Sequence, residues 1–86
     1  MHTALDESLL AAKRVLEAAL LCAREPLSWR DMHALFAGSL DRPQLESMID
    51  ALVREWDASR GLELLPVATG WRFQSRPEMR EYLDRL

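Results

Sequence analysis

The segment from Pro43 to Ala58 constrains the fold most, because its apolar residues recur at steps of three and four positions. This spacing is typical of an amphipathic helix that turns one side toward a core. The apolar stripe consists of Leu45, Met48, Ile49, Leu52, Val53 and Trp56. Asp41 and Gln44 have the spacing of a capping box, and Pro43 suits a first helical turn, where its missing N–H costs nothing. The segment is therefore predicted to be the central helix.

The side of this helix opposite the apolar stripe carries mostly acidic charge. At about 100° per residue, it presents Glu46, Ser47, Asp50, Ala51, Arg54 and Asp57. Acids outnumber arginine on this side, so it repels a phosphate backbone more than it attracts one. DNA-binding helix-turn-helix proteins lay the corresponding surface in the major groove. Sequence-specific DNA binding is therefore not expected.

Two further helices are predicted before the central one. The first runs from Leu5 to about Arg24. Its inward face consists of Leu5, Leu9, Ala12, Leu16, Ala19, Leu20 and Ala23. Pro26 ends it, because the residue before a proline is biased away from helical angles. Ser28 can cap a short second helix that ends at Gly38. The apolar face of this second helix consists of Trp29, Met32, Leu35 and Phe36.

Alternating residues after the central helix predict a β-hairpin, the wing of a winged helix. Its two runs are Leu62–Ala68 and Trp71–Ser75, with Thr69-Gly70 as the expected turn. Pro66 lacks a backbone donor and is therefore expected at an edge or a bulge.

A last helix is predicted after the hairpin, because Ser75 and Glu78 repeat the Ser-x-x-acid capping pattern. Its apolar side consists of Met79, Tyr82, Leu83 and Leu86. One core is expected to join all the elements. Its predicted members are Leu16, Leu20, Phe36, Leu52, Trp56, Phe73 and Leu83. The predicted fold class is mainly α with a small β-hairpin, a winged helix-turn-helix, in a single domain over residues 1–86.

The composition narrows the class of protein. A charged fraction of 29% beside 49% hydrophobic residues is typical of a globular domain, and a net charge of −3 gives no general attraction to nucleic acid or anionic lipid. Cys22 is the single cysteine, so an intrachain disulfide is impossible, which fits a reducing compartment. No apolar run reaches the roughly 20 residues that span a bilayer, and the acidic N-terminal segment is unlike a signal peptide. A soluble cytoplasmic domain is expected.

No pattern for catalysis or metal binding is present. His2 and His33 are far apart in the sequence, and His33 lies at the edge of an apolar helical face. Cys22 has no neighbouring histidine and belongs to an apolar flank, where packing explains it. The three glycines form no phosphate-binding loop. Neither a cofactor nor a small-molecule substrate is expected.

The first helix offers one candidate partner-binding surface. Leu10, Arg14, Glu17 and Leu21 lie about a third of a turn or more away from the centre of its inward face. Single exposed leucines are ordinary, but two on one stripe favour an interface. Across a two-fold axis, Arg14 and Glu17 could pair reciprocally between two copies.

The wing offers a second candidate surface, which includes Trp71 and Arg72. Arg60 and Arg76 bracket the same hairpin. Two interpretations remain open. Trp71 folds back over the helices while the arginines are solvated, or these residues form a contact surface, since Arg and Trp are enriched at binding hot spots. The arginines could also touch phosphates, but weakly and with strong salt dependence.

Five stretches of the chain, in this order, resemble the N-terminal winged helix of the segregation and condensation protein B (ScpB) family. They are LEAAL at 16–20, EPLS at 25–28, GLEL at 61–64, GWRFQS at 70–75 and RPE at 76–78. The chain departs from the family at Leu21-Cys22, where an apolar residue and an aromatic are usual.

The resemblance implies a role in a protein complex. Family members are non-catalytic subunits of the bacterial SMC–kleisin (SMC–ScpA–ScpB) complex, which acts in chromosome condensation and segregation. It implies the kleisin subunit (ScpA) and, through it, SMC as partners, pairing into a homodimer, and association with the nucleoid. Family members continue into a second winged helix that carries much of the kleisin binding. The chain is therefore expected to be the N-terminal half of a longer protein or a shortened relative.

Two functions of different classes remain in view. The first is a protein-interaction and dimerisation module. The alternative is a DNA-binding winged-helix transcriptional regulator, which depends on element order alone, and fold does not fix function. DNA readers carry a basic stripe on both helix and wing, and here only the wing has one. An enzyme is a distant third.

Overall fold

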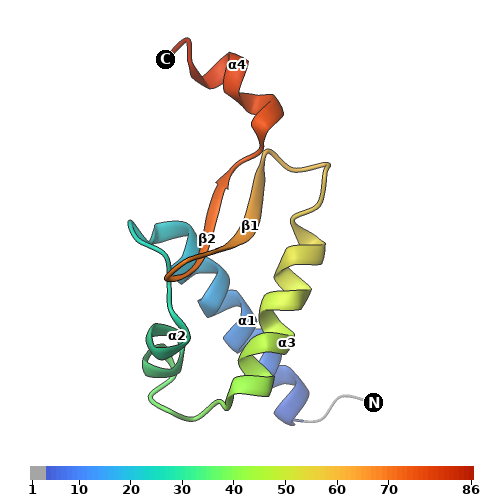
Figure 1. Cartoon of the computed structure of the whole chain (residues 1–86). Coiled ribbons are helices and arrows are strands. Elements are labelled where there is room, and N and C mark those ends of the chain that lie inside the picture. The colour runs from blue at the N-terminus through green and yellow to red at the C-terminus, as the bar shows by residue number, and fades with distance from the viewer. Residues whose placement is uncertain (1–3) are drawn as a thin grey trace.

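The structure is a computed structural model that describes residues 4–86, with side chains from Ser8 onward. Its elements are α1 (Ala4–Cys22), α2 (Trp29–Leu35), α3 (Arg42–Glu55), β1 (Leu62–Val67), β2 (Gly70–Ser75), the 3-10 helix η1 (Pro77–Met79) and α4 (Arg80–Leu83). Three helices pack beside an antiparallel hairpin, while α4 extends away from them (Figure 1). The predicted fold, a winged helix dominated by helices, is confirmed.

Both predicted helix starts are present as full capping boxes. Gln44 N donates to Asp41 Oδ1 over 2.9 Å, and Asp41 N donates to Gln44 Oε1 over 3.0 Å. Ser28 and Asp31 exchange the same two hydrogen bonds at the start of α2. The donors from Ser28, first its backbone N–H and then its hydroxyl, hold the pKa of Asp31 below its usual value. Local side-chain chemistry therefore sets where α2 and α3 begin.

The core lies between α1, α2, α3 and β1. Its buried side chains are Leu16, Leu20, Met32, Leu45, Met48, Ile49, Leu52 and Leu64. Phe36, Trp56 and Phe73 pack against this core, as predicted. Two expectations were wrong. Leu83 is 46% exposed because α4 leaves the body of the domain, and Val53 is 39% exposed because it lies at the outer edge of the α3 stripe.

The hairpin turn lies one residue earlier than predicted. Val67 pairs with Gly70, so Ala68 and Thr69 form the turn and Gly70 belongs to β2. Gly70 has φ +158°, and a Cβ there would lie 2.2 Å from the carbonyl oxygen of Leu27. Glycine is thus required by a close approach of two backbone segments rather than by the turn.

Leu27 acts as a one-residue third strand beside β2. Leu27 N donates to the carbonyl oxygen of Trp71, and Trp71 N donates to that of Leu27, both over 2.9 Å. Pro66 lies opposite Trp71 on β1, the other neighbour of β2. The Trp71 backbone N–H and C=O are bonded to Leu27, so the β1 residue opposite Trp71 needs no backbone N–H for the ladder. Proline is therefore tolerated at position 66, in keeping with its predicted edge position.

The expected last helix is shorter than its pattern indicated. Ser75 is the final residue of β2, and Arg76 takes the N-cap position of η1 without a side-chain hydrogen bond. The predicted cap at Ser75 was therefore wrong. Short helices gain most of their stability from packing, and α4 keeps its apolar side chains largely exposed. The segment forms only one 3-10 turn and one short α-helical turn.

We expect Leu52→Ala to lower the free energy of unfolding by about 2–5 kcal/mol, because it empties a fully buried site in the core. Val53→Ala, one residue further along α3, is the control and should cost under about 1 kcal/mol, since Val53 is partly solvated. Chemical denaturation measures both values. Equal losses would contradict the observed orientation of α3.

Gly70→Ala should destabilise the domain by more than about 1 kcal/mol, because the new Cβ overlaps the Leu27 carbonyl and the φ angle is unfavourable. Gly61→Ala is the matched control, since its Cβ would meet only the Met79 side chain, with the sulfur at 3.7 Å. Thermal unfolding of the two variants compares them. A loss at Gly61 equal to that at Gly70 would show that the Leu27 approach is not limiting.

Candidate protein-interaction surfaces

The outward face of α1 is largely apolar. Leu10 and Leu21 are 51% and 44% exposed, which agrees with their predicted position away from the core. The other exposed apolar residues of this face are Ala11, Val15, Ala18 and Cys22. Arg14 is the charge in their midst, and a shallow depression runs beside it between Ala11 and Ala18. This "α1 outer face", defined by these seven residues, extends well beyond the two leucines that the sequence singled out.

Glu17 is turned toward the body of the domain rather than outward. Its Oε2 accepts a hydrogen bond from Trp56 Nε1 over 2.7 Å, in a partly buried setting. Lys13, one turn earlier, forms an ion pair with Glu55 of α3. Both contacts join α1 to α3, and the Trp56 ring also packs on Phe73 at 4.7 Å between centroids. Glu17 therefore contributes to the domain itself, which leaves Arg14 without the neighbour that sequence spacing had suggested.

The wing residues are drawn into the domain as well. The half-buried ring of Trp71 meets Trp29 edge-on at 6.4 Å. Arg76 Nη2 donates to the carbonyl oxygen of Trp56 over 2.6 Å. The Arg60 guanidinium lies over the Trp56 ring, 4.8 Å from its centroid. Trp71 thus folds back over the helices, and of the wing arginines Arg72 is the exposed one on a strand.

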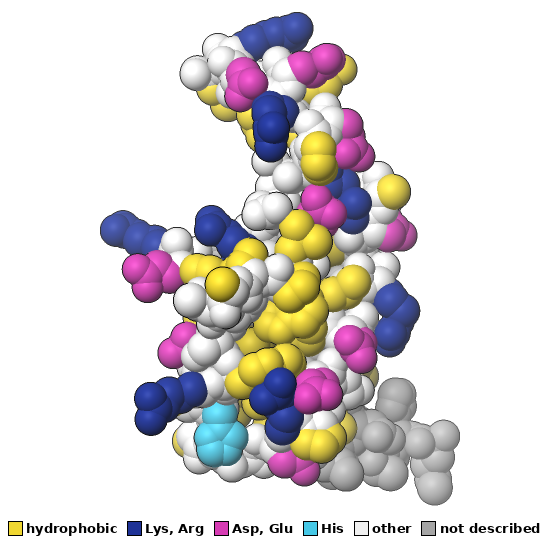
Figure 2. Space-filling model, in the orientation of Figure 1, with side chains coloured by type: hydrophobic (Ala, Val, Ile, Leu, Met, Phe, Trp, Pro, Cys, Tyr) yellow, Lys and Arg dark blue, Asp and Glu magenta, His cyan; other side chains and the backbone are white. Residues whose placement is uncertain are grey.

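The outer face of α3 keeps its acidic character. Glu46 pairs with Arg42 at 2.8 Å, and Asp50 is exposed. Ser59 donates from its hydroxyl and its backbone N–H to Asp57, which lowers the pKa of that carboxyl. Lysine and arginine side chains are dispersed among acidic ones on the face shown in Figure 2, with no continuous basic stripe. This arrangement does not suit a DNA backbone.

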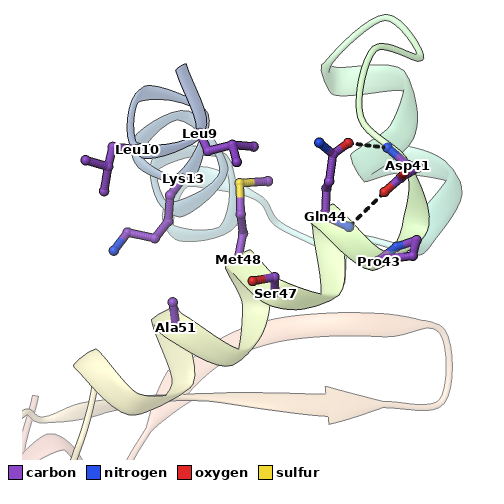
Figure 3. A pocket seen from close by; sticks show the side chains of 9 residues that line it. All are labelled: Leu9, Leu10, Lys13, Asp41, Pro43, Gln44, Ser47, Met48 and Ala51. Atoms are coloured by element: carbon purple, nitrogen blue, oxygen red, sulfur yellow. Dashed lines mark hydrogen bonds between the residues drawn. The ribbon is translucent and has the colours of Figure 1, made fainter. Parts of the chain in front are cut away.

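A groove lies between the N-terminal halves of α1 and α3 (Figure 3). Its volume is about 680 Å³; Leu9 lies toward Met48, whereas Leu10 projects away from Met48, beyond Lys13. Ser47 and Ala51 line its α3 side, so these two residues belong to the groove and not to the acidic face where the helical wheel placed them. Sequence reasoning missed this groove because two helices far apart in the chain contribute to it.

A metal-binding cluster and a membrane-spanning helix are both absent from the described residues. Within residues 8–86, no three His, Cys, Asp or Glu side chains gather closely enough to hold a metal ion. His33 is exposed at the end of α2. None of the helices in the described range is both long and apolar enough to cross a membrane.

Comparison with known proteins identifies the family. Residues 14–86 match the family described as "Segregation and condensation complex subunit ScpB". The chain belongs to this family. It is 34% identical over 76 residues to the segregation and condensation protein B homolog of Coxiella burnetii. That match covers 86% of this chain but 36% of the relative, so the chain spans about a third of the relative's length.

Solved structures support the fold. A conserved hypothetical protein from Chlorobium tepidum superposes with a TM-score of 0.79 at 25% identity, covering 92% of this chain and 49% of that one. ScpB from Mycobacterium tuberculosis gives 0.78 at 24% identity, with coverages of 90% and 48%. A dimer of an ScpB N-terminal domain complexed with ScpA peptide gives 0.79 at 22% identity, with coverages of 91% and 96%. The chain thus has the fold of an ScpB N-terminal domain.

We expect no tight DNA binding by this chain. The acidic side chains on its α3 face repel phosphates, and its arginines are too scattered to form a continuous phosphate-binding surface. Fluorescence anisotropy with mixed duplexes at physiological salt should show only weak, salt-sensitive association. Affinity near the nanomolar range of specific readers would contradict the orientation and charge argued for α3.

Proposed function

We propose that the chain is a non-catalytic subunit of an SMC–kleisin complex that acts in chromosome condensation and segregation in the cytoplasm. Membership of the ScpB family is the observation that carries the proposal. The partner is a kleisin of the ScpA type, which links the chain to SMC. One structural neighbour, a dimer of an ScpB N-terminal domain complexed with ScpA peptide, supports this kind of partner.

The chain acts in this complex as an interaction and dimerisation module. The relatives from Coxiella burnetii, Chlorobium tepidum and Mycobacterium tuberculosis are about twice or more as long, which supports a role as the N-terminal part of a two-domain protein. Kleisin binding is tested by titrating the chain with the kleisin subunit of the same genome in a calorimeter. Binding at micromolar or tighter affinity supports the role, and the absence of a binding signal at high micromolar concentration opposes it for this domain.

The α1 outer face is the proposed seam between two copies. A helix that is apolar on both sides is normally covered on both sides, and the core covers only the inner one. Leu10, Arg14 and Leu21 lie on the seam itself, with Glu17 beside it. Trp71 and Arg72 form the competing wing surface, of which Arg72 is the exposed member.

Leu21→Glu should convert a dimer into a folded monomer, because it places a charge in the apolar seam. Arg72→Glu is the control on the wing and should leave the dimer intact. Light scattering coupled to size-exclusion chromatography measures the mass, and circular dichroism confirms folding. Loss of the dimer with Arg72→Glu but not with Leu21→Glu would show that the two copies meet at the wing. A wild-type chain that is monomeric at high micromolar concentration would contradict the proposed dimer.

A further inference from the structure

The C-terminal segment carries a ridge of exposed apolar side chains. Tyr82, Leu83 and Leu86 are all exposed, and α4 projects beyond the hairpin, away from the helical body (Figure 1). The turn continues past α4, because Leu86 N donates to the Leu83 carbonyl oxygen over 3.1 Å. Spacings of three and four residues place these side chains on one side of the segment. Amphipathic helices that dock into grooves use anchors with this spacing.

Arginines flank this ridge. The Arg85 guanidinium lies 5.6 Å from the centroid of the Tyr82 ring. Helical geometry places Arg80 at the opposite edge, beyond Leu83, and turns Glu81 to the back. The ridge therefore presents an apolar centre with positive edges.

The groove between α1 and α3 offers an apolar floor that can receive such a ridge. It lies at the end of the molecule opposite α4 and is open to solvent beside the exposed Leu10 (Figures 1 and 3). Its charged lining residues are Asp41, at the rim, and Lys13, which forms an ion pair with Glu55 of α3. The apolar floor matches the apolar ridge, and Asp41 is the lining carboxylate that can meet one of its basic edges.

We propose that the groove binds α4 of a second copy of this chain, with Tyr82, Leu83 and Leu86 as the inserted side chains. This docking rests on the proposed function, which already requires two copies, and it specifies how they hold one another. Leu10 belongs to both the α1 outer face and the groove, so the two contact surfaces are continuous.

The area of the α1 outer face supports a second contact. The α1 outer face runs from Leu10 to Cys22, about 20 Å of helix, and with a width of about 10 Å it offers a footprint of about 200 Å². Stable dimers bury about 800 Å² per subunit. The α1 face alone falls well short of this, and α4 in the groove adds contact at both ends of the pair.

The shape of the molecule allows both contacts to form in one closed dimer. The chain is elongated, with extents of 46 × 30 × 18 Å, and the ridge and the groove lie near opposite ends of it. Two copies arranged antiparallel about a two-fold axis place each α4 beside the other copy's groove. Such reciprocal exchange closes the assembly instead of extending it into a fibre.

Disulfide trapping tests the docking. The exposed Cys22 is first removed by Cys22→Ser. One protein then carries Ser47→Cys in the groove and another carries Leu83→Cys on the ridge, and the two are mixed under mild oxidation. We expect a mixed covalent dimer on a non-reducing gel. A mixture of Ser47→Cys with Glu81→Cys, on the back of α4, is the matched control and should give several-fold less.

A second measurement does not depend on cross-linking. Leu83→Glu with Leu86→Glu should raise the dimer dissociation constant about tenfold or more, whereas Glu81→Gln with Asp84→Asn should change it little. A wild-type dimer that is unaffected by the leucine changes and gives no 47–83 cross-link would overturn the docking while leaving the proposed function standing. A wild-type chain that binds the kleisin but stays monomeric would overturn both the docking and the pairing. A ladder of larger species from a Ser47→Cys, Leu83→Cys double variant would overturn the closed arrangement.

Discussion

Two backbone hydrogen bonds between Leu27 and Trp71 hold the wing against the helices, and much of the arrangement depends on them. They bring two backbone segments so close that position 70 has no room for a Cβ. They also fix β2 so that the Trp71 ring meets Trp29 instead of solvent. The wing is therefore a packed part of the domain.

The polar groups around Trp56 reinforce the same arrangement. Its indole N–H donates to Glu17 of α1, and its backbone carbonyl accepts from Arg76, directly after β2. One residue at the end of α3 thus joins the first helix to the wing. Hydrogen bonds to charged partners contribute more than neutral ones, particularly where water is partly excluded. The charged groups of Glu17 and Arg76 form hydrogen bonds within the domain. They are therefore not free on the surfaces where sequence spacing had suggested a binding role.

The features that could be predicted from the sequence are those that depend on residues close together in the chain. The starts of α2 and α3 follow from side chains three residues apart, and the exposure of Leu10 and Leu21 follows from helical period alone. The errors at Gly70, Ser75 and Leu83 have a different origin. Each depends on what a distant segment does: Leu27 approaches Gly70, the ladder continues through Ser75, and no core lies beneath Leu83. The groove was hidden for the same reason, since α1 and α3 build it jointly.

The outer sides of α1 and α3 differ in character, and this difference suits the winged helix to protein contacts. In α3 the core takes the apolar stripe, and the opposite side holds exposed acids such as Glu46 and Asp50. In α1 the inner side contributes Leu16 and Leu20 to the core, but the outer side remains apolar around Arg14. A domain of this size buries only about 60–65% of its unfolded surface, so an uncovered apolar helix face is a large share of what it leaves exposed. Covering that face stabilises the folded state by mass action, because a partner binds the folded chain and not the unfolded one. Folding stability and assembly are thereby coupled through α1, the element that contributes to both the core and the proposed seam.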